Sequence, residues 1–260
     1  MIRLAAPLLA CLVGCGRLDF GEVSDSGVPD GAVDTVQTVG HDEDGDGIDD
    51  AIDTCPHMPG SNADGDGDGV GDLCDPHPGT PGDHIGVFSP LEPGTSPFDD
   101  ITGFSESPDG LHHVGDTSIY LTRPFGTARI EIGFDILEIL GTGQHQIGVG
   151  IARTTEPYYF AELNDNTGAT VRDVAILSYD ATNGYVALDS VTSPALHTGR
   201  GIVRIDADAT AHTYAAVAGW EGELFNAMAA TPQYAGGIKA HCSLNGLDLV
   251  IRYIIIIDSP

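Results

Sequence analysis

One stretch, HDEDGDGIDDAIDTCP, constrains the fold of this chain most strongly. It runs from His41 to Pro56 and holds seven acidic residues in sixteen positions, interleaved with glycine and without Lys or Arg. Like charges this close repel one another, and the stretch has few apolar side chains that a core could bury. The segment therefore needs a positively charged partner before it can become compact.

The negative charge is unevenly distributed along the 260 residues. The formal net charge is −29, from 10 Lys and Arg against 39 Asp and Glu. Eighteen of the acidic residues, and no Lys or Arg, lie between Leu18 and Asp83. Charge of this sign repels nucleic acid and anionic lipid surfaces, so we expect no nucleic-acid partner. The rest of the chain is long enough to bury a core of its own.

An internal repeat indicates what the partner is. DEDGDGIDDAID (42–53) aligns with DGDGDGVGDLCD (64–75) at an offset of 22 residues. Both copies have acidic residues at positions 1, 3, 5, 9 and 12, glycine at 6 and an apolar residue at 7, which is the spacing of a calcium-binding loop. We expect about two Ca²⁺ ions, since Mg²⁺ prefers a tight octahedron and keeps its waters.

The expected ligands come from the same positions of both copies. Gly47 and Gly69, at position 6, allow the sharp turn that brings the carboxylates together. The residues at position 7 contribute their carbonyl oxygens, and those at position 9 act through water. The first ion is assigned to Asp42, Asp44, Asp46, Ile48, Asp50 and Asp53, and the second to Asp64, Asp66, Asp68, Val70, Asp72 and Asp75.

The sequence around these loops differs from that of an EF-hand, which needs a helix on each side. The prolines of TCPHMPG, directly after Asp53, forbid a helix there. DEDGDGIDDAIDTCP followed by NADGDGDGVGDLCD instead resembles thrombospondin type 3 repeats, over residues 41–76. The resemblance implies calcium loops without regular secondary structure and a disulfide between Cys55 and Cys74.

The chain begins MIRLAAPLLACLVGCG, which has the layout of a secretory signal peptide over residues 1–15. LVGC, ending at Cys15, resembles the lipobox of bacterial lipoproteins. This resemblance implies lipidation of Cys15 and favours the outer membrane or cell surface, with simple secretion as the alternative. Residues 16–40 read as a disordered acidic spacer. Cys242, alone on a strand-like stretch, is interpreted as a small buried apolar residue.

After a Pro/Gly linker at residues 77–84, residues 85–260 show short runs in which apolar and polar residues alternate. This pattern predicts an all-β fold, with a C-terminal antiparallel β-sandwich after the irregular repeats. TNG at 182–184 predicts a hairpin, and YIIIID at 253–258 predicts a last strand with both faces covered. The runs are TSIYLT, ARIEIGFDILEI, QIGVGIAR, YYFAEL, VAILSYD, GYVALDS, GIVRIDA, GGIKAHCSL and LDLVIRYIIIID.

The order of these parts resembles the concanavalin A-like, laminin-G-like jelly roll. FDDITGFSESPDGLHHVGDTSIYLT resembles its opening strands, ARIEIGFDILEI its long central strand, and GGIKAHCSLNGLDLVIRYIIIID its closing pair. Within this superfold, some glucanases carry a Glu-x-Asp-x-x-Glu strand. GFDILE matches at Asp135 and Glu138 but has Gly133 in the nucleophile position, so we expect no enzyme.

A binding function fits better. Glycan-binding sandwiches use aromatic rings together with polar loop residues. Trp220, the one Trp, precedes a loop-like EGELFN and is either a sugar platform or a core residue, and of Tyr158 and Tyr159 one points inward. His112 and His113 are expected in a turn. The sequence thus predicts a lipid-anchored calcium-binding protein that presents a lectin-like sandwich to a glycan or surface protein; a secreted, degraded glycoside hydrolase is the alternative.

Overall fold

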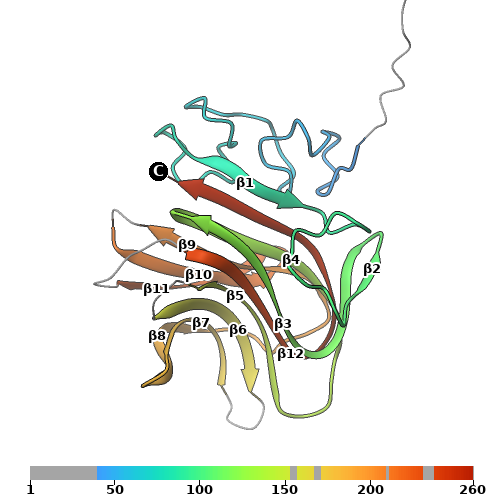
Figure 1. Ribbon diagram of the computed structural model, residues 1–260, viewed down its shortest axis with the longest axis vertical. Coiled ribbons are helices and arrows are strands. Elements are labelled where there is room, and N and C mark those ends of the chain that lie inside the picture. Colours follow the sequence, from blue (N-terminus) through green and yellow to red (C-terminus); the bar gives the residue numbers. More distant parts are fainter. Residues whose placement is uncertain (1–39, 153–156, 167–170, 209–210, 231–236, 260) are drawn as a thin grey trace, which may run out of the picture. The chain divides into compact units, whose positions relative to one another are not determined.

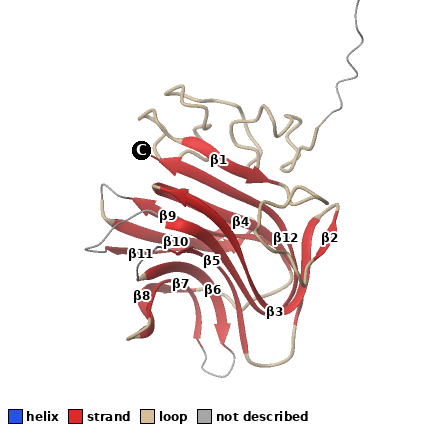
Figure 2. Cartoon of the chain, viewed as in Figure 1, coloured by secondary structure: helices blue, strands red, loops and turns tan. Residues whose placement is uncertain are grey.

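The chain divides into two units, residues 1–38 and 39–260. The computed structural model describes residues 40–152, 157–166, 171–208, 211–230 and 237–259, all within the second unit. These residues form strands, turns and loops without a helix, so the predicted all-β class is confirmed (Figure 2). The strands are β1 (His84–Ser89), β2 (Ser105–Ser107), β3 (Gly110–Phe125), β4 (Thr127–Ile139), β5 (Gln144–Ala152), β6 (Tyr158–Asn166), β7 (Val171–Asp180), β8 (Gly184–Thr192), β9 (Gly199–Asp208), β10 (Thr213–Trp220), β11 (Glu223–Ala230) and β12 (Gly237–Ser259).

The described strands join into one antiparallel sheet of twelve strands in the order β11-β10-β9-β4-β12-β5-β6-β7-β8, with β1 and β3 also paired to β12 and β2 paired to β3. The long β12 curves and belongs to two layers (Figure 1). Its first half pairs with β5, and its second half pairs with β4 and β1. The β5–β8 layer and the β4–β9–β10–β11 layer therefore face each other across one core, as in a sandwich.

Alternation along the strands decides which side chains enter this core. In β6, Tyr159, Ala161 and Leu163 are buried in the core cluster, whereas Tyr158 lies on the other face. Tyr159 stacks on Tyr214 of β10 with ring centroids 4.1 Å apart. The expectation that one of the two adjacent tyrosines points inward is confirmed. Cys242 is likewise a fully buried free cysteine.

The YIIIID stretch of β12 has both faces covered, as predicted. Ile254 and Ile256 lie in the core of the sandwich. Tyr253, Ile255 and Ile257 point the opposite way and pack in a second cluster with Cys55, Val70 and Cys74 of the acidic repeats. The repeats therefore cover the outer side of this layer.

Residues 40–83 adopt only turns and bends, as the resemblance to thrombospondin repeats implies. Cys55 and Cys74 form the expected disulfide, with Cα atoms 5.7 Å apart. Arg129 of β4 donates a hydrogen bond to the Cys74 carbonyl at 2.6 Å, and Arg252 of β12 pairs with Glu43 at 2.6 Å. Apolar packing and polar contacts from two partly buried arginines, Arg129 and Arg252, thus hold the repeats on the sandwich.

Three expectations about local structure were wrong. EGELFN after Trp220 is not a loop, because β10 ends at Trp220 and β11 begins at Glu223. The expected closing pair is the single strand β12, which continues through irregular pairing near Gly246. His112 and His113 lie in β3 rather than in a turn, and His112 bonds Asp248 across the strands at 2.7 Å.

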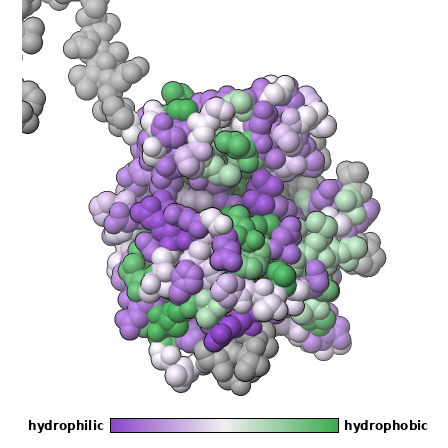
Figure 3. All heavy atoms as spheres, turned by 180° about the vertical axis from the view of Figure 1, so that it is seen from behind, coloured by the Kyte–Doolittle hydropathy of each residue, from purple (hydrophilic) through white to green (hydrophobic). Residues whose placement is uncertain are grey.

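Figure 3 shows that hydrophilic residues cover most of the face opposite to that of Figure 1, with hydrophobic residues gathered in smaller patches. In the part of the chain that the structure describes, no helix is both long and apolar enough to cross a bilayer.

Replacing Ile256 by Ala tests the role of β12 in the core. Ile256 is fully buried, so the truncation should lower the free energy of unfolding by ~2–5 kcal/mol, through lost burial and a residual cavity. Urea denaturation measures the change. Leu137→Ala on neighbouring β4 is the matched control, because Leu137 is 49% exposed and should cost within about 0.5 kcal/mol. Equal losses in the two variants would contradict the assigned core.

Candidate functional site: acidic loops and an aromatic face

The two acidic loops have the same hydrogen-bond geometry. The position-1 carboxylates accept the N–H groups of positions 4 and 6: Asp42 from Gly45 and Gly47, and Asp64 from Gly67 and Gly69. The glycines at position 6 have φ values of 91° and 97°, which confirms the sharp turns expected there. The repeat seen in the sequence is therefore a repeat in structure.

Both loops bring carboxylates together, and some of the carboxylate oxygens lack hydrogen-bond partners. The side-chain oxygens of positions 1, 3 and 5 converge within 4.8 Å of one another in each copy, Asp42–Asp44–Asp46 and Asp64–Asp66–Asp68. One oxygen of Asp44 and both oxygens of Asp66 are buried without a hydrogen-bond partner. Converging, unsatisfied carboxylate oxygens are the donor set that a hard divalent cation takes, so the residues present fit Ca²⁺.

The carboxylates at position 12, Asp53 and Asp75, also have oxygen atoms that could bind a cation. Asp53 and Asp75 are buried, and one oxygen of each lacks a hydrogen-bond partner. Asp75 lies in a further group with Asp68 and Asp83. Asp83, whose side chain is fully buried, was missed by the sequence analysis because it falls in the Pro/Gly linker, outside the repeat.

The predicted ligands at positions 9 and 7 also make contacts within the loops, and their ligation stays a prediction. At position 9, Asp50 accepts the Glu43 N–H at 3.0 Å and Asp72 accepts the Gly65 N–H at 2.8 Å, so both brace the loop from within. At position 7, Val70 is fully buried in the cluster beneath β12 and Ile48 is half-buried. Ligation by the Ile48 and Val70 carbonyls stays a prediction.

Burial and mutual repulsion show in the pKa values of these groups. Burial chiefly raises the pKa of Asp44 to about 6, helped by the charges of Asp46 and Asp53. Burial likewise raises the pKa of Asp75 to about 6, with Asp83 adding to the effect. Burial would raise the pKa of Asp83 too, but hydrogen bonds from Asp75 and its other neighbours lower it. The loops carry an uncompensated negative charge that a bound cation would neutralise.

A second candidate site lies on the outer face of the β5–β8 layer, opposite the core. Six aromatic rings form a continuous row there, which we call the aromatic face. Neighbouring ring centroids lie between 4.7 and 6.1 Å apart. The row runs from β3 through β12, β6 and β8 to β7 and back to β6: Tyr120, His241, Phe160, Tyr185, Tyr179 and Tyr158.

Two glycines of β5 make room for this row. A Cβ atom on Gly150 would lie 2.3 Å from the Phe160 ring, and one on Gly148 would lie 2.8 Å from Glu162. Because these two positions of β5 have no side chain, the side chains of Phe160 and Glu162 can lie across the strand. Tyr120, at one end of the row, is 41% exposed, and Tyr185, within the row, is 62% exposed, so the row is open to solvent at these two rings.

Polar groups lie beside the rings on the same face. Gln146 donates to Glu162 at 2.7 Å and to Ser243 at 3.3 Å. A shallow hollow of about 360 Å³ adjoins them, lined in part by Asp116 and Asn245. Rings next to amide, hydroxyl and carboxyl groups form a surface that can stack against a sugar and hydrogen-bond its hydroxyls.

Burial changes the titration of two groups on this face. It raises the pKa of Glu162 to about 7, partly offset by a hydrogen bond from Asn164. It lowers the pKa of His241 to about 4. Near neutral pH, His241 is therefore uncharged and Glu162 is close to its midpoint.

The structure places the other candidate residues of the sequence analysis away from the aromatic face. Trp220 is only 5% exposed and stacks on His197 at 4.0 Å, on the opposite layer. Gly133 occupies the nucleophile position of the glucanase pattern. The Tyr253 ring lies directly over it: a Cβ atom added to Gly133 would be only 2.1 Å from this ring. Asp135 pairs with Arg200 at 3.8 Å. Cys15 lies outside the described residues.

Comparison of the sequence with models of known protein families finds no match, and comparison with curated proteins finds none either. The fold is similar to those of solved lectins. Peanut lectin, solved with a nine-residue peptide, matches with a TM-score of 0.50 at 8% identity, over 66% of this chain and 96% of that one. At such identities the similarity shows the fold alone, and it confirms a lectin-like β-sandwich.

Two further lectins match less well. The winged bean acidic lectin, solved with methyl-α-D-galactose, has a TM-score of 0.46 at 10% identity, covering 61% of this chain and 91% of that one. Lectin II from Ulex europaeus has a TM-score of 0.46 at 10% identity, covering 67% and 100%.

Replacing Glu162 by Gln should change how stability depends on pH. Folding raises the pKa of Glu162 from 4.5 to about 7, so the folded protein holds this proton more tightly than the unfolded chain does. The resulting contribution to stability is fully present below pH 4.5 and is lost as the pH rises through 7. Because Gln cannot ionise, the variant should be more stable than the parent above pH 7, by ~3 kcal/mol. Thermal unfolding from pH 4 to 8 measures this. Exposed Glu138→Gln is the control, and parallel curves for parent and Glu162→Gln would refute the assignment.

Proposed function

We propose that the protein is a calcium-binding, glycan-binding module in which acidic repeats support a lectin-like β-sandwich. The observation that carries the proposal is the aromatic face, a row of rings beside Gln146 and Glu162 in which Tyr120 and Tyr185 are exposed. Exposed rings such as those of Tyr120 and Tyr185 have a free-energy cost in water that stacking on a sugar would reduce. The lectins of similar fold are consistent with this proposal.

Calcium is proposed for the repeats on three grounds: the carboxylates converge, several of their oxygens lack partners, and the sequence resembles thrombospondin type 3 repeats. Asp42, Asp44, Asp46 and Asp53 would hold one ion, and Asp64, Asp66, Asp68 and Asp75 the other. A bound cation would cancel the repulsion between carboxylates and let the loops keep the shape that packs on β12.

Glycan binding is tested by array screening of the full chain, followed by titration with the best ligand. Tyr185→Ala and Tyr120→Ala should each weaken binding by about fivefold, or ~1 kcal/mol, since each removes one exposed ring. Met228→Ala is the matched control, because Met228 is also exposed (56%) but lies on β11. Unchanged affinity in both tyrosine variants would contradict the proposal, and release of reducing sugar would favour the hydrolase instead.

Asp44→Asn and Asp66→Asn test the calcium loops with little structural damage. Asn can keep the bond that one Asp44 oxygen accepts from the Asp46 N–H, and Asp66 accepts no bond that would be lost. Calorimetry should show one ion fewer in each single variant, with dissociation constants of ~10⁻⁴–10⁻³ M in the parent. At ten times that concentration each ion should add about 1.4 kcal/mol of stability. If the double variant still titrates two ions, the loops are not the calcium sites.

A lipid anchor at Cys15 is proposed from LVGC alone. It would hold the module at the outer membrane or cell surface, with residues 16–40 as the spacer. Mass spectrometry of the mature N-terminus should find a diacylglyceryl-modified Cys15. An unmodified N-terminus downstream of Cys15 would instead indicate a secreted protein.

A further inference from the structure

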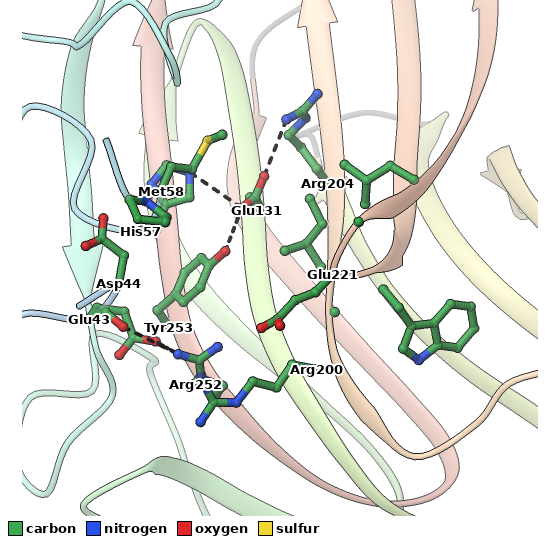
Figure 4. A pocket seen from close by; sticks show the side chains of 16 residues that line it. Glu43, Asp44, His57, Met58, Glu131, Arg200, Arg204, Glu221, Arg252 and Tyr253 are labelled. Atoms are coloured by element: carbon green, nitrogen blue, oxygen red, sulfur yellow. Dashed lines mark hydrogen bonds and ion pairs between the residues drawn. The ribbon is translucent and has the colours of Figure 1, made fainter. Parts of the chain in front are cut away.

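A cavity of about 600 Å³ lies between the acidic repeats and the layer that they cover (Figure 4). The repeats contribute Glu43, Asp44, His57 and Met58 to its lining, and strands β4, β9 and β12 and the β10–β11 turn contribute the rest. We call it the arginine pocket and define it by Arg200, Arg204, Arg252, Glu131, His57 and Trp220. It is separate from the aromatic face, which lies on the other side of the core.

Cations are concentrated here in a chain that has few of them. Three of the ten Lys and Arg residues line the pocket. Arg252 pairs with Glu43 at 2.6 Å, and Arg204 pairs with Asp206 at 3.0 Å and Glu131 at 3.5 Å. Arg200 is different, because its side chain is 55% exposed and its ion pair, with Asp135, is long at 3.8 Å. Arg200 therefore has donors to offer an incoming anion.

The pocket also offers acceptors. Glu221, in the β10–β11 turn, is an exposed carboxylate at the rim. Glu131 is buried, with a side chain 2% exposed. One of its oxygens accepts a hydrogen bond from Tyr253 at 2.7 Å, and the other forms no hydrogen bond but only the long ion pair with Arg204 at 3.5 Å. His57 faces Glu131 at 3.5 Å, and its Nδ1 is buried without a partner (Figure 4). The Glu131 oxygen and the His57 Nδ1 therefore each lack a hydrogen bond, which hydroxyl groups of a ligand could supply.

Apolar side chains complete the walls. Met58 from the repeats, Ile202 from β9 and Leu224 from β11 line the pocket between the polar groups. Such a mixture suits a compact ligand with an apolar ring face and polar edges. A volume of about 600 Å³ is ample for one or two sugar units.

These groups exclude simpler ligands. A neutral sugar would leave Arg200 with only its long ion pair to Asp135. A plain dicarboxylate would offer no hydroxyl group to the Glu131 oxygen that lacks a hydrogen bond, and would be repelled by Glu221. We propose that the arginine pocket binds a sugar acid, a saccharide unit that carries a carboxylate for Arg200 and hydroxyl groups for Glu221 and Glu131.

Calorimetric titration of the full chain tests the proposal with D-glucuronate, D-galacturonate and N-acetylneuraminate as probes. D-glucose and succinate serve as comparisons, since one lacks the carboxylate and the other the ring hydroxyls. At least one sugar acid should bind ten times more tightly than both comparisons. If no sugar acid binds, or glucose or succinate binds as tightly, the proposal is overturned.

Variants locate the site. Arg200→Gln should weaken sugar-acid binding at least tenfold, whereas Arg172→Gln on β7, an arginine of similar exposure (49%), should not change it. Tyr185→Ala distinguishes this site from the aromatic face. Loss of sugar-acid binding in Tyr185→Ala with retention in Arg200→Gln would place the ligand on the aromatic face, which overturns this inference but leaves the proposed function intact. Retention in both variants would also overturn it.

Discussion

The burial of β12 on both faces is the constraint on which the structure depends. Its alternate side chains Ile254 and Ile256 fill the sandwich core, and Ile255 and Ile257 would face water if the acidic repeats did not cover them. The cover consists of a disulfide, Val70 and little other apolar surface, so it cannot hold its shape by burial alone. Calcium, as proposed, would supply the missing stability, because it removes the repulsion that opposes a compact cover.

The two layers of the sandwich consequently have different outer surfaces. The β5–β8 layer has no strand or repeat packed on its outer side among the described residues, and there the aromatic face lies open. The opposite layer is covered. There Arg252 pairs with Glu43 of the repeats, and Arg204 pairs with Glu131 of β4. In a chain of net charge −29, this arrangement gathers three of the ten Lys and Arg residues around one pocket.

Features set by local sequence could be predicted, and those set by strand order could not. The acidic repeat, the hairpin at TNG and the covered last strand follow from spacing and periodicity that neighbouring residues carry. Strands β10 and β11 were missed because TYAAVAGW and ELFNAMAA are rich in alanine, a weak strand former that is held here by packing. The disulfide was correctly implied by family resemblance alone.

The aromatic face and the arginine pocket also could not be predicted from the sequence, because both depend on the order of the strands in the sheet. Phe160, His241 and Tyr120 belong to strands far apart in sequence, and only the pairing of β12 with β3 and β5 makes them neighbours. Asp83 was overlooked because it stands outside the repeat and reaches Asp68 and Asp75 only through the folded linker. In each case the chemistry depends on a contact that single-sequence patterns do not encode.

Hydrogen exchange measured with calcium and with a chelator tests most directly whether calcium holds the cover on the sandwich. The account predicts that chelation removes protection from the amides of residues 41–76, such as those of Gly47 and Gly69, while β6 and β7 keep theirs. Binding of an apolar dye should rise at the same time, as Ile255 and Ile257 become exposed. Unchanged protection of residues 41–76 on chelation would contradict the account.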